Sequence, residues 1–88
     1  MDYTALITID LPGATDRERD KFYEKLKIAR WVKLDNLTTA WQVGWGDDIP
    51  RDAAIKDLKN DIKNAKYLSG VNKVNYAFQV GKGSLEIG

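Results

Sequence analysis

The sequence YTALITIDL, residues 3–11, alternates apolar and polar side chains along most of its length. Every odd position is apolar, and three of the four even positions carry Thr or Asp. A period of two is typical of a β-strand that has one face in a hydrophobic core. Residues 3–11 are therefore predicted to form the first strand, with Asp10 near its C-terminal end on the polar face.

A turn and an amphipathic helix are predicted after this strand. Pro12-Gly13 is a strong turn signal. Thr15 and Glu18 have the spacing of a capping box, in which each side chain binds the backbone N–H of the other residue. The helix is expected to end near Ala29. Its core-facing side chains are predicted to be Phe22, Leu26 and Ala29, with Tyr23 beside them.

The rest of the chain is predicted to form a hairpin, a second helix and a last strand. The hairpin strands are expected over residues 31–35 and 38–45, with the turn between them. A helix over residues 51–68 should end before Gly70, and a strand should follow over residues 72–80. The apolar stripe of this helix consists of Ile55, Leu58, Ile62 and Ala65.

The three tryptophans of the chain lie in the predicted hairpin. Trp41 and Trp45 share a strand face with Val43, so we expect them in the core or against the helices. Trp31 shares the parity of Lys33, and both a buried and a partly exposed position stay open for it. On the last strand, the side chains predicted to face the core are Val74, Tyr76, Phe78 and Val80.

The order strand, helix, strand, strand, helix, strand is that of a ferredoxin-like α+β sandwich. Right-handed crossovers place both helices on one face of a four-stranded antiparallel sheet, in the spatial order fourth, first, third, second. Residues 1–88 are expected to form this single domain. Residues 81–88 are predicted to be either a short additional strand through Leu85 and Ile87 or a frayed tail.

The composition excludes several classes of chemistry. The 88 residues contain neither Cys nor His, which rules out disulfides, thiolate metal sites, Cys nucleophiles and His-based acid–base devices. The net charge of +1 gives no overall attraction to nucleic acid or to an anionic membrane. An enzyme built from this chain would have to use carboxylates, a lysine, a tyrosine or a carboxylate-bound metal.

The sequence also indicates in which cellular compartment the protein is expected. It has no apolar run approaching the length of about 18 residues that a transmembrane helix needs. Its start lacks the charged and apolar segments of a secretory signal. We therefore expect a cytoplasmic protein with no membrane partner.

Two aspartates suggest a metal site at one rim of the sheet. The first and second strands run parallel, so Asp10 and Asp35 should meet at the same rim, both on the face without helices. Asn36, Thr38 and Asn72 should bring neutral oxygens to this rim. Carboxylate and neutral oxygens suit Mg²⁺, which could activate water for phosphodiester cleavage without histidine. The alternative is structural, because aspartates at strand ends often bind turn amides.

Basic side chains suggest a contact with phosphates. Arg17 and Arg19 lie on the first helix, and Lys33 is placed on the open face of the sheet. The alternative is an ordinary solvated surface. An RRM is disfavoured, because the open face of the last strand lacks the aromatic pair that stacks RNA bases in those domains.

The first half of the chain resembles a known family. Ile9-Asp10, followed by Arg17, Phe22, Leu26 and the hairpin over residues 31–45, is similar to the small CRISPR-adaptation endonucleases and to the ribonuclease family of the antitoxin GhoS. The resemblance implies a ferredoxin-like homodimer with Asp10 of each protomer near the two-fold axis. It also implies metal-dependent cleavage of RNA or DNA.

Three functions remain open from the sequence. The first is a dimeric, Mg²⁺-dependent endoribonuclease or antitoxin-like regulator that uses Asp10 as its catalytic residue. The second is a non-catalytic module, of phage or plasmid type, that binds a protein partner. The third is a metabolite-sensing domain that binds its ligand at a dimer interface.

Overall fold

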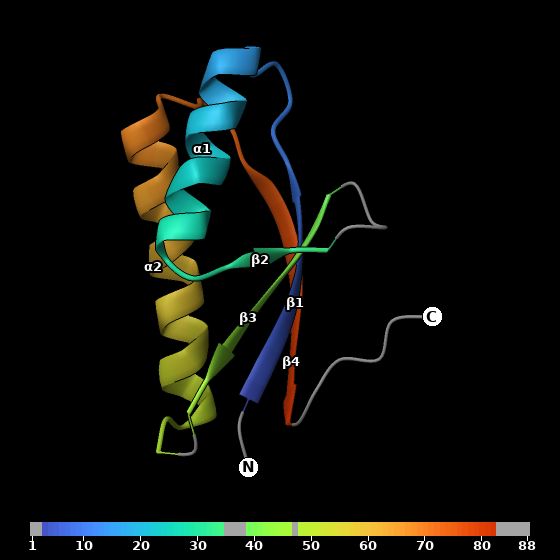
Figure 1. Cartoon of the computed structure of the whole chain (residues 1–88), viewed down its shortest axis with the longest axis vertical. Coiled ribbons are helices and arrows are strands. Elements are labelled where there is room, and N and C mark those ends of the chain that lie inside the picture. Colours follow the sequence, from blue (N-terminus) through green and yellow to red (C-terminus); the bar gives the residue numbers. More distant parts are fainter. Residues whose placement is uncertain (1–2, 35–38, 47, 83–88) are drawn as a thin grey trace.

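The computed structural model describes residues 3–34, 39–46 and 48–82. Its elements, in chain order, are β1 (Tyr3–Asp10), α1 (Asp16–Ile28), β2 (Val32–Lys33), β3 (Ala40–Trp45), α2 (Arg51–Ser69) and β4 (Asn75–Lys82), as Figure 1 shows. Neither helix has the length and apolarity of a membrane span.

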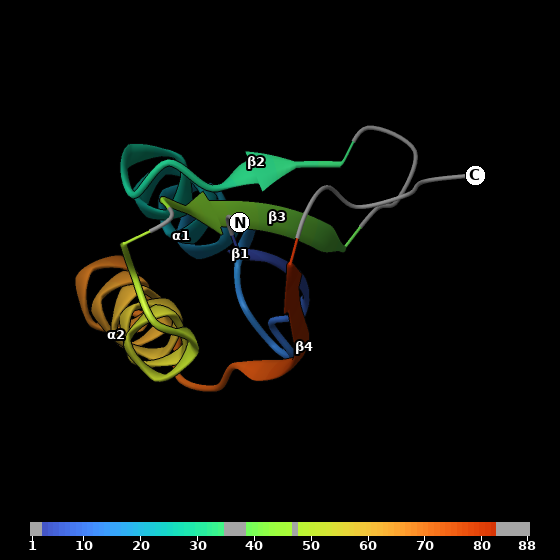
Figure 2. The ribbon, with the colours of Figure 1, turned by 90° about the horizontal axis from the view of Figure 1, so that it is seen from below.

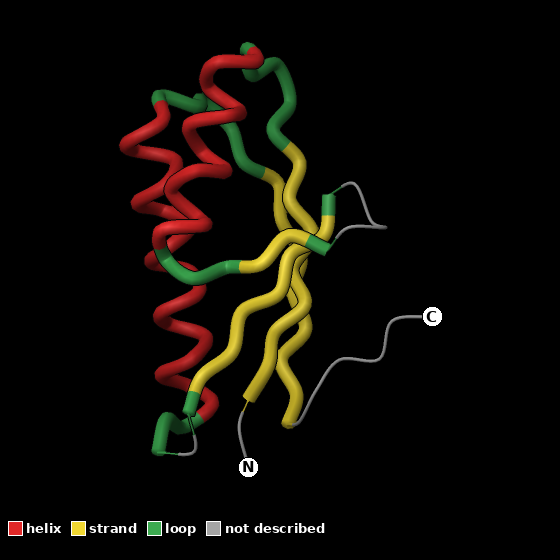
Figure 3. Tube along the Cα trace, in the orientation of Figure 1, coloured by secondary structure: helices red, strands yellow, loops and turns green. Residues whose placement is uncertain are grey.

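The strands form one antiparallel sheet in the order β2-β3-β1-β4. Figures 1 and 3 show both helices in a layer on one face of this sheet. Figure 2 shows that α1 lies on the side of β2 and α2 on the side of β4. The predicted ferredoxin-like α+β arrangement and strand order are therefore confirmed, and no helix of the described residues lies on the opposite face of the sheet.

The core lies between the sheet and the two helices. The odd positions Ala5, Ile7, Ile9 and Leu11 are buried, as their alternation predicted. Phe22 and Leu26 of α1 and Leu58 and Ile62 of α2 meet them from the helix layer. Removal of apolar side chains from water is the main force that holds the two layers together. The core is therefore built from β1 at the centre of the sheet.

Hydrogen bonds fix both ends of α1. The Thr15 hydroxyl accepts from the Glu18 backbone N–H at 3.1 Å, and the Glu18 carboxylate accepts from the Thr15 N–H at 2.9 Å. At the other end Arg30 has a φ of 71°, while Trp31 N–H donates to the Leu26 carbonyl and Arg30 N–H to that of Lys27. This is a Schellman motif with arginine where glycine is usual. At the N-terminal end, the two bonds between Thr15 and Glu18 confirm the predicted capping box.

The second strand differs most from its prediction. Among the described residues 31–34, only Val32 and Lys33 are in strand conformation. The Trp31 side chain is 2% exposed, whereas Val32 is 53% exposed. Lys33 lies opposite Trp41, so it is on the helix-covered face of the sheet and not on the open face as predicted. The turn at Arg30 decides which side chains of β2 face the helices. The Trp31 backbone N–H completes the end of α1, and the Trp31 side chain is buried in the core. The partly exposed alternative for Trp31 is therefore wrong.

The last strand was predicted over residues 72–80, and β4 both begins and ends later, at Asn75–Lys82. Val80 is buried and Phe78 is half-buried, but Tyr76 is 41% exposed, although all three share the helix-covered face. Because β4 is an edge strand, the helix layer covers it less fully than it covers β1. Of the expected tail, residues 81–88, Gly81 and Lys82 belong to β4 and pair with β1, and residues 83–88 lie outside the described residues.

Candidate functional site

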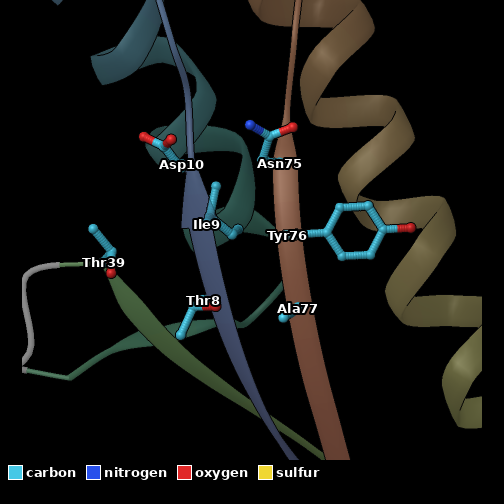
Figure 4. Close-up of a pocket in the computed structure, with 7 residues that line it drawn as sticks. All are labelled: Thr8, Ile9, Asp10, Thr39, Asn75, Tyr76 and Ala77. Atoms are coloured by element: carbon cyan, nitrogen blue, oxygen red, sulfur yellow. The ribbon is translucent and has the colours of Figure 1, made fainter.

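Asp10 lies at the C-terminal end of β1, exposed to solvent. The strand register places it opposite Asn75 of β4, and Figure 4 shows both side chains at the same rim of the sheet. An open depression of about 350 Å³ covers this corner. It is lined by Thr8, Ile9, Asp10, Thr39, Asn75, Tyr76 and Ala77.

Neighbouring strands bring neutral oxygen atoms to this depression. The Ile9 backbone N–H donates to the Thr39 carbonyl at 3.0 Å, which ties the chain just before β3 to the end of β1. Thr8, Thr39 and Asn75 therefore accompany Asp10 in the lining. The predicted Asn72 is exposed in the connection to β4 and does not line the depression, because β4 begins at Asn75.

The donor set of the depression fits a hard cation only in part. One carboxylate and several neutral oxygens are of the type that Mg²⁺ prefers, but this cation takes six oxygen ligands. Within residues 3–34, 39–46 and 48–82, no three Asp, Glu, His or Cys residues are placed so that they could hold a metal ion together. Asp35, the predicted second carboxylate, and its neighbours Asn36 and Thr38 lie outside these residues. Water, a phosphate group or a second chain would have to complete the coordination.

The predicted phosphate-binding residues do not line the depression around Asp10. Arg19 bonds to the Asp16 carboxylate at 3.2 Å and to the Ala14 carbonyl at 3.4 Å, so its guanidinium is engaged near the start of α1. Arg17 is exposed in the first turn of the same helix. Lys33 lies on β2, on the helix-covered face. The structure thus brings none of the three to Asp10.

A second group of residues was missed by sequence reasoning. Lys56, Lys59, Lys63 and Lys66 of α2 are all exposed, and the Lys59 ammonium lies 6.0 Å from the centre of the Phe78 ring. Phe78 stacks on Tyr76, with ring centres 6.3 Å apart and planes at 17°. The spacing of the lysines, in steps of three, four and three, signals one helix face. Their proximity to the β4 rings requires the tertiary packing.

The opposite flank of α2 carries an acid with a perturbed pKa. The Trp31 Nε1–H donates to the Asp61 carboxylate at 2.9 Å. Burial raises the pKa of Asp61 above its ordinary value, and the nearby charge of Asp57 adds to the rise, while the Trp31 hydrogen bond opposes it. Asp61 also lines a groove of about 190 Å³ between the helices. Its other lining residues are Lys25, Ile28, Ala29, Asn64, Ala65 and Leu68.

Comparisons with protein-family models, with curated proteins and with solved structures found no match to this chain. The family resemblance in the first half of the sequence therefore stays a prediction.

Proposed function

We propose that the protein acts on nucleic acid as a homodimeric, Mg²⁺-dependent endoribonuclease or antitoxin-like regulator, with Asp10 as the catalytic residue. The observation that carries the proposal is the position of Asp10, exposed at a sheet rim among neutral oxygen donors from β1, β4 and the residue before β3. The chain has neither His nor Cys, so a carboxylate-bound cation is the device best suited to phosphodiester chemistry here.

The residues at the rim have distinct roles in this proposal. The Asp10 carboxylate supplies the negative charge that anchors the cation. The Asn75 amide and the Thr39 hydroxyl offer neutral oxygens beside it. A bound Mg²⁺ would neutralise charge on the phosphodiester and lower the pKa of a coordinated water. The openness of the depression suits a polymeric substrate, because a backbone can cross the rim without entering a closed cavity.

The homodimer follows from the shortage of ligands on one chain. Asp10 is the one carboxylate that lines the depression among the described residues. A second protomer related by a two-fold axis near this rim would bring a second Asp10 to the same cation. Two carboxylates supply the charge that a single strand end lacks.

The test is cleavage of a labelled single-stranded RNA with and without Mg²⁺ by the wild type and by Asp10→Asn. We expect the cleavage rate of the variant to fall by more than about a hundredfold. Mutating a residue that only orients a metal ligand already costs about 10- to 100-fold, and Asp10 is proposed as a ligand itself. Asp20→Asn, which changes an exposed acid on α1, is the matched control and should cleave normally. Equal cleavage by Asp10→Asn, or none by the folded wild type with Mg²⁺, contradicts the proposal.

A second candidate function is a non-catalytic protein-binding module. The observation that favours it is the exposure of Ile28 at 68% and Leu68 at 50%, both lining the groove between α1 and α2. Exposed aliphatic side chains gathered at one groove are typical of a protein contact. A stoichiometric protein complex that is lost in Ile28→Ser, together with no Mg²⁺-dependent hydrolysis, would select this function over the first.

A further inference from the structure

We infer that single-stranded nucleic acid binds along the outer edge of the helix-covered face, where α2 meets the edge strand β4. Four lysines of α2 form what we call the basic stripe: Lys56, Lys59, Lys63 and Lys66. The inference takes its ligand class from the proposed function. It concerns a surface that adjoins the Asp10 rim at Tyr76, and binding there requires neither Asp10 nor a metal.

The basic stripe is a continuous row of charge. Successive members are three, four and three residues apart, which places all four lysines on one flank of the helix. They are all exposed to solvent. With a rise of 1.5 Å per residue, the row from Lys56 to Lys66 extends for about 15 Å. Such a row matches the extended negative charge of a phosphate backbone.

Aromatic rings accompany the basic stripe. On β4, Tyr76 and Phe78 stack on one another, and Lys59 reaches the Phe78 ring. Figure 4 shows the Tyr76 ring projecting from the edge of β4 toward the side of α2 and away from Asp10. On α2, Tyr67 is 85% exposed and lines a depression of about 400 Å³ with Lys63 and Lys66. Exposed rings beside a basic row are the platforms on which unpaired bases stack.

The acids of α2 are held mainly on its other flank. Asp61 accepts a hydrogen bond from Trp31, and Asp57 is close enough to raise the pKa of Asp61. Asp52, in the first turn of α2, is the exception, because it lies four residues before Lys56 and so on the same flank as the basic stripe. Charge is therefore partly separated on α2, with the Lys59 flank facing β4 and with Asp57 and Asp61 toward Trp31.

The other described surfaces fit nucleic acid less well. The register assigns to the open face of the sheet the positions Thr4, Leu6, Thr8, Asp10, Val32, Ala40, Gln42, Gly44, Asn75, Ala77, Gln79 and Gly81. These described positions include no cation and no aromatic ring. On α1 the basic residues alternate with acids, and Arg19 is engaged by Asp16. Phosphate attraction and base stacking thus coincide at α2 and β4.

The two surfaces are joined by β4 itself. Asn75, which lies opposite Asp10, is followed in the chain by Tyr76, whose ring is directed to the other side of the strand edge. A single strand held on the basic stripe would therefore lead toward the rim that carries Asp10. The strand β4 thus connects the proposed binding surface to the proposed catalytic carboxylate.

The experiment measures binding of a fluorescein-labelled oligouridylate by anisotropy, in EDTA and over a range of salt. For contacts to four phosphates, the affinity should fall roughly fifty-fold between about 50 and 200 mM salt. In Lys59→Ala/Lys63→Ala the affinity should drop, and the same rise in salt should cost only about sevenfold. Tyr67→Ala should weaken binding by about tenfold with little change in salt dependence.

The matched control is Lys21→Ala/Lys27→Ala, which removes the same charge from exposed positions of α1. It should bind with nearly the wild-type salt dependence, and all variants should keep the wild-type circular dichroism. The titration is made in EDTA, so a failure of the Mg²⁺-dependent cleavage proposal leaves this measurement unaffected. The inference is overturned if both lysine pairs have equal effects, if duplex RNA binds as well as the single strand, or if the wild type does not bind.

Discussion

Asp61 and Trp31 form a side-chain pair whose strength should depend on pH. The indole N–H donates to the Asp61 carboxylate at 2.9 Å, in the groove between α1 and α2. Burial, with a contribution from Asp57, raises the pKa of Asp61 above its ordinary value. The folded state therefore holds the Asp61 proton more tightly than the unfolded state does.

The sign of the effect on stability follows from this raised pKa. Above about pH 4 the unfolded state loses the Asp61 proton first, so this residue's contribution to stability falls as pH rises toward its folded pKa. Asp61→Asn cannot ionise and should remove that fall. We expect the variant to be at least as stable as the wild type at pH 7, with its advantage shrinking toward pH 4. Urea unfolding of both proteins across this range measures the difference, and a constant difference would contradict the assignment.

Single residues were predictable from the sequence where a strand period fixed their face. Asp10 was placed correctly at the exposed end of β1, because eight residues of alternation left little freedom in parity. The face of Trp31 stayed open, since it is set where the Trp31 backbone N–H completes the end of α1 after the positive φ of Arg30. Asn75 was missed as the neighbour of Asp10, because the pairing of β1 with β4 depends on where β4 begins.

At the level of elements, the two helices end in the same left-handed conformation with different residues. Gly70 has a φ of 79° after α2, and Arg30 has a φ of 71° after α1. Glycine adopts this region freely, whereas a residue with a Cβ is disfavoured there by roughly 1 kcal/mol. The positive φ of Arg30 therefore costs part of the stability that the hydrogen bonds at the end of α1 contribute.

Replacing Arg30 by glycine should relieve this strain. We expect Arg30→Gly to raise the free energy of unfolding by about 0.5–1 kcal/mol, because the Schellman hydrogen bonds at Leu26 and Lys27 are backbone bonds that glycine keeps. The matched control is Gly70→Ala, where an added Cβ would meet nothing closer than a Glu18 oxygen at 3.8 Å but the φ is unfavourable. This change should destabilise by about 1 kcal/mol. Chemical denaturation measures both, and a destabilising Arg30→Gly would contradict the interpretation.

The long elements could be predicted from the sequence together with their faces, whereas for the short strand β2 the place was predicted but the face was wrong. Over the 13 residues of α1 and the 19 residues of α2 the apolar stripe is repeated several times, so each helix is identified by more than one turn. β2 has two residues, too few to show a period of two. β4 was found, but its start was placed too early, because the apolar Val74 continues the alternation ahead of Asn75.

For the whole molecule, the order of elements was enough to predict the sheet and the side on which both helices lie. The proposed binding surface was not predictable in this way. The lysines of α2 looked like ordinary flanking charges in the sequence, and Tyr76 and Phe78 looked like core residues. Only the position of α2 over the edge of the sheet places Lys59 against the Phe78 ring and leaves Tyr76 partly exposed. Long-range packing thus decides where nucleic acid is expected to bind.

The most direct test is a titration of ¹⁵N-labelled protein with an oligouridylate, followed by amide chemical shifts, first in EDTA and then with Mg²⁺. In EDTA we expect shifts concentrated in residues 56–67 of α2 and 76–78 of β4. With Mg²⁺ we expect further shifts at Asp10 and Asn75. Shifts confined to α1 or to the open face of the sheet, or none at saturating ligand, would contradict a nucleic-acid function carried by α2, β4 and Asp10.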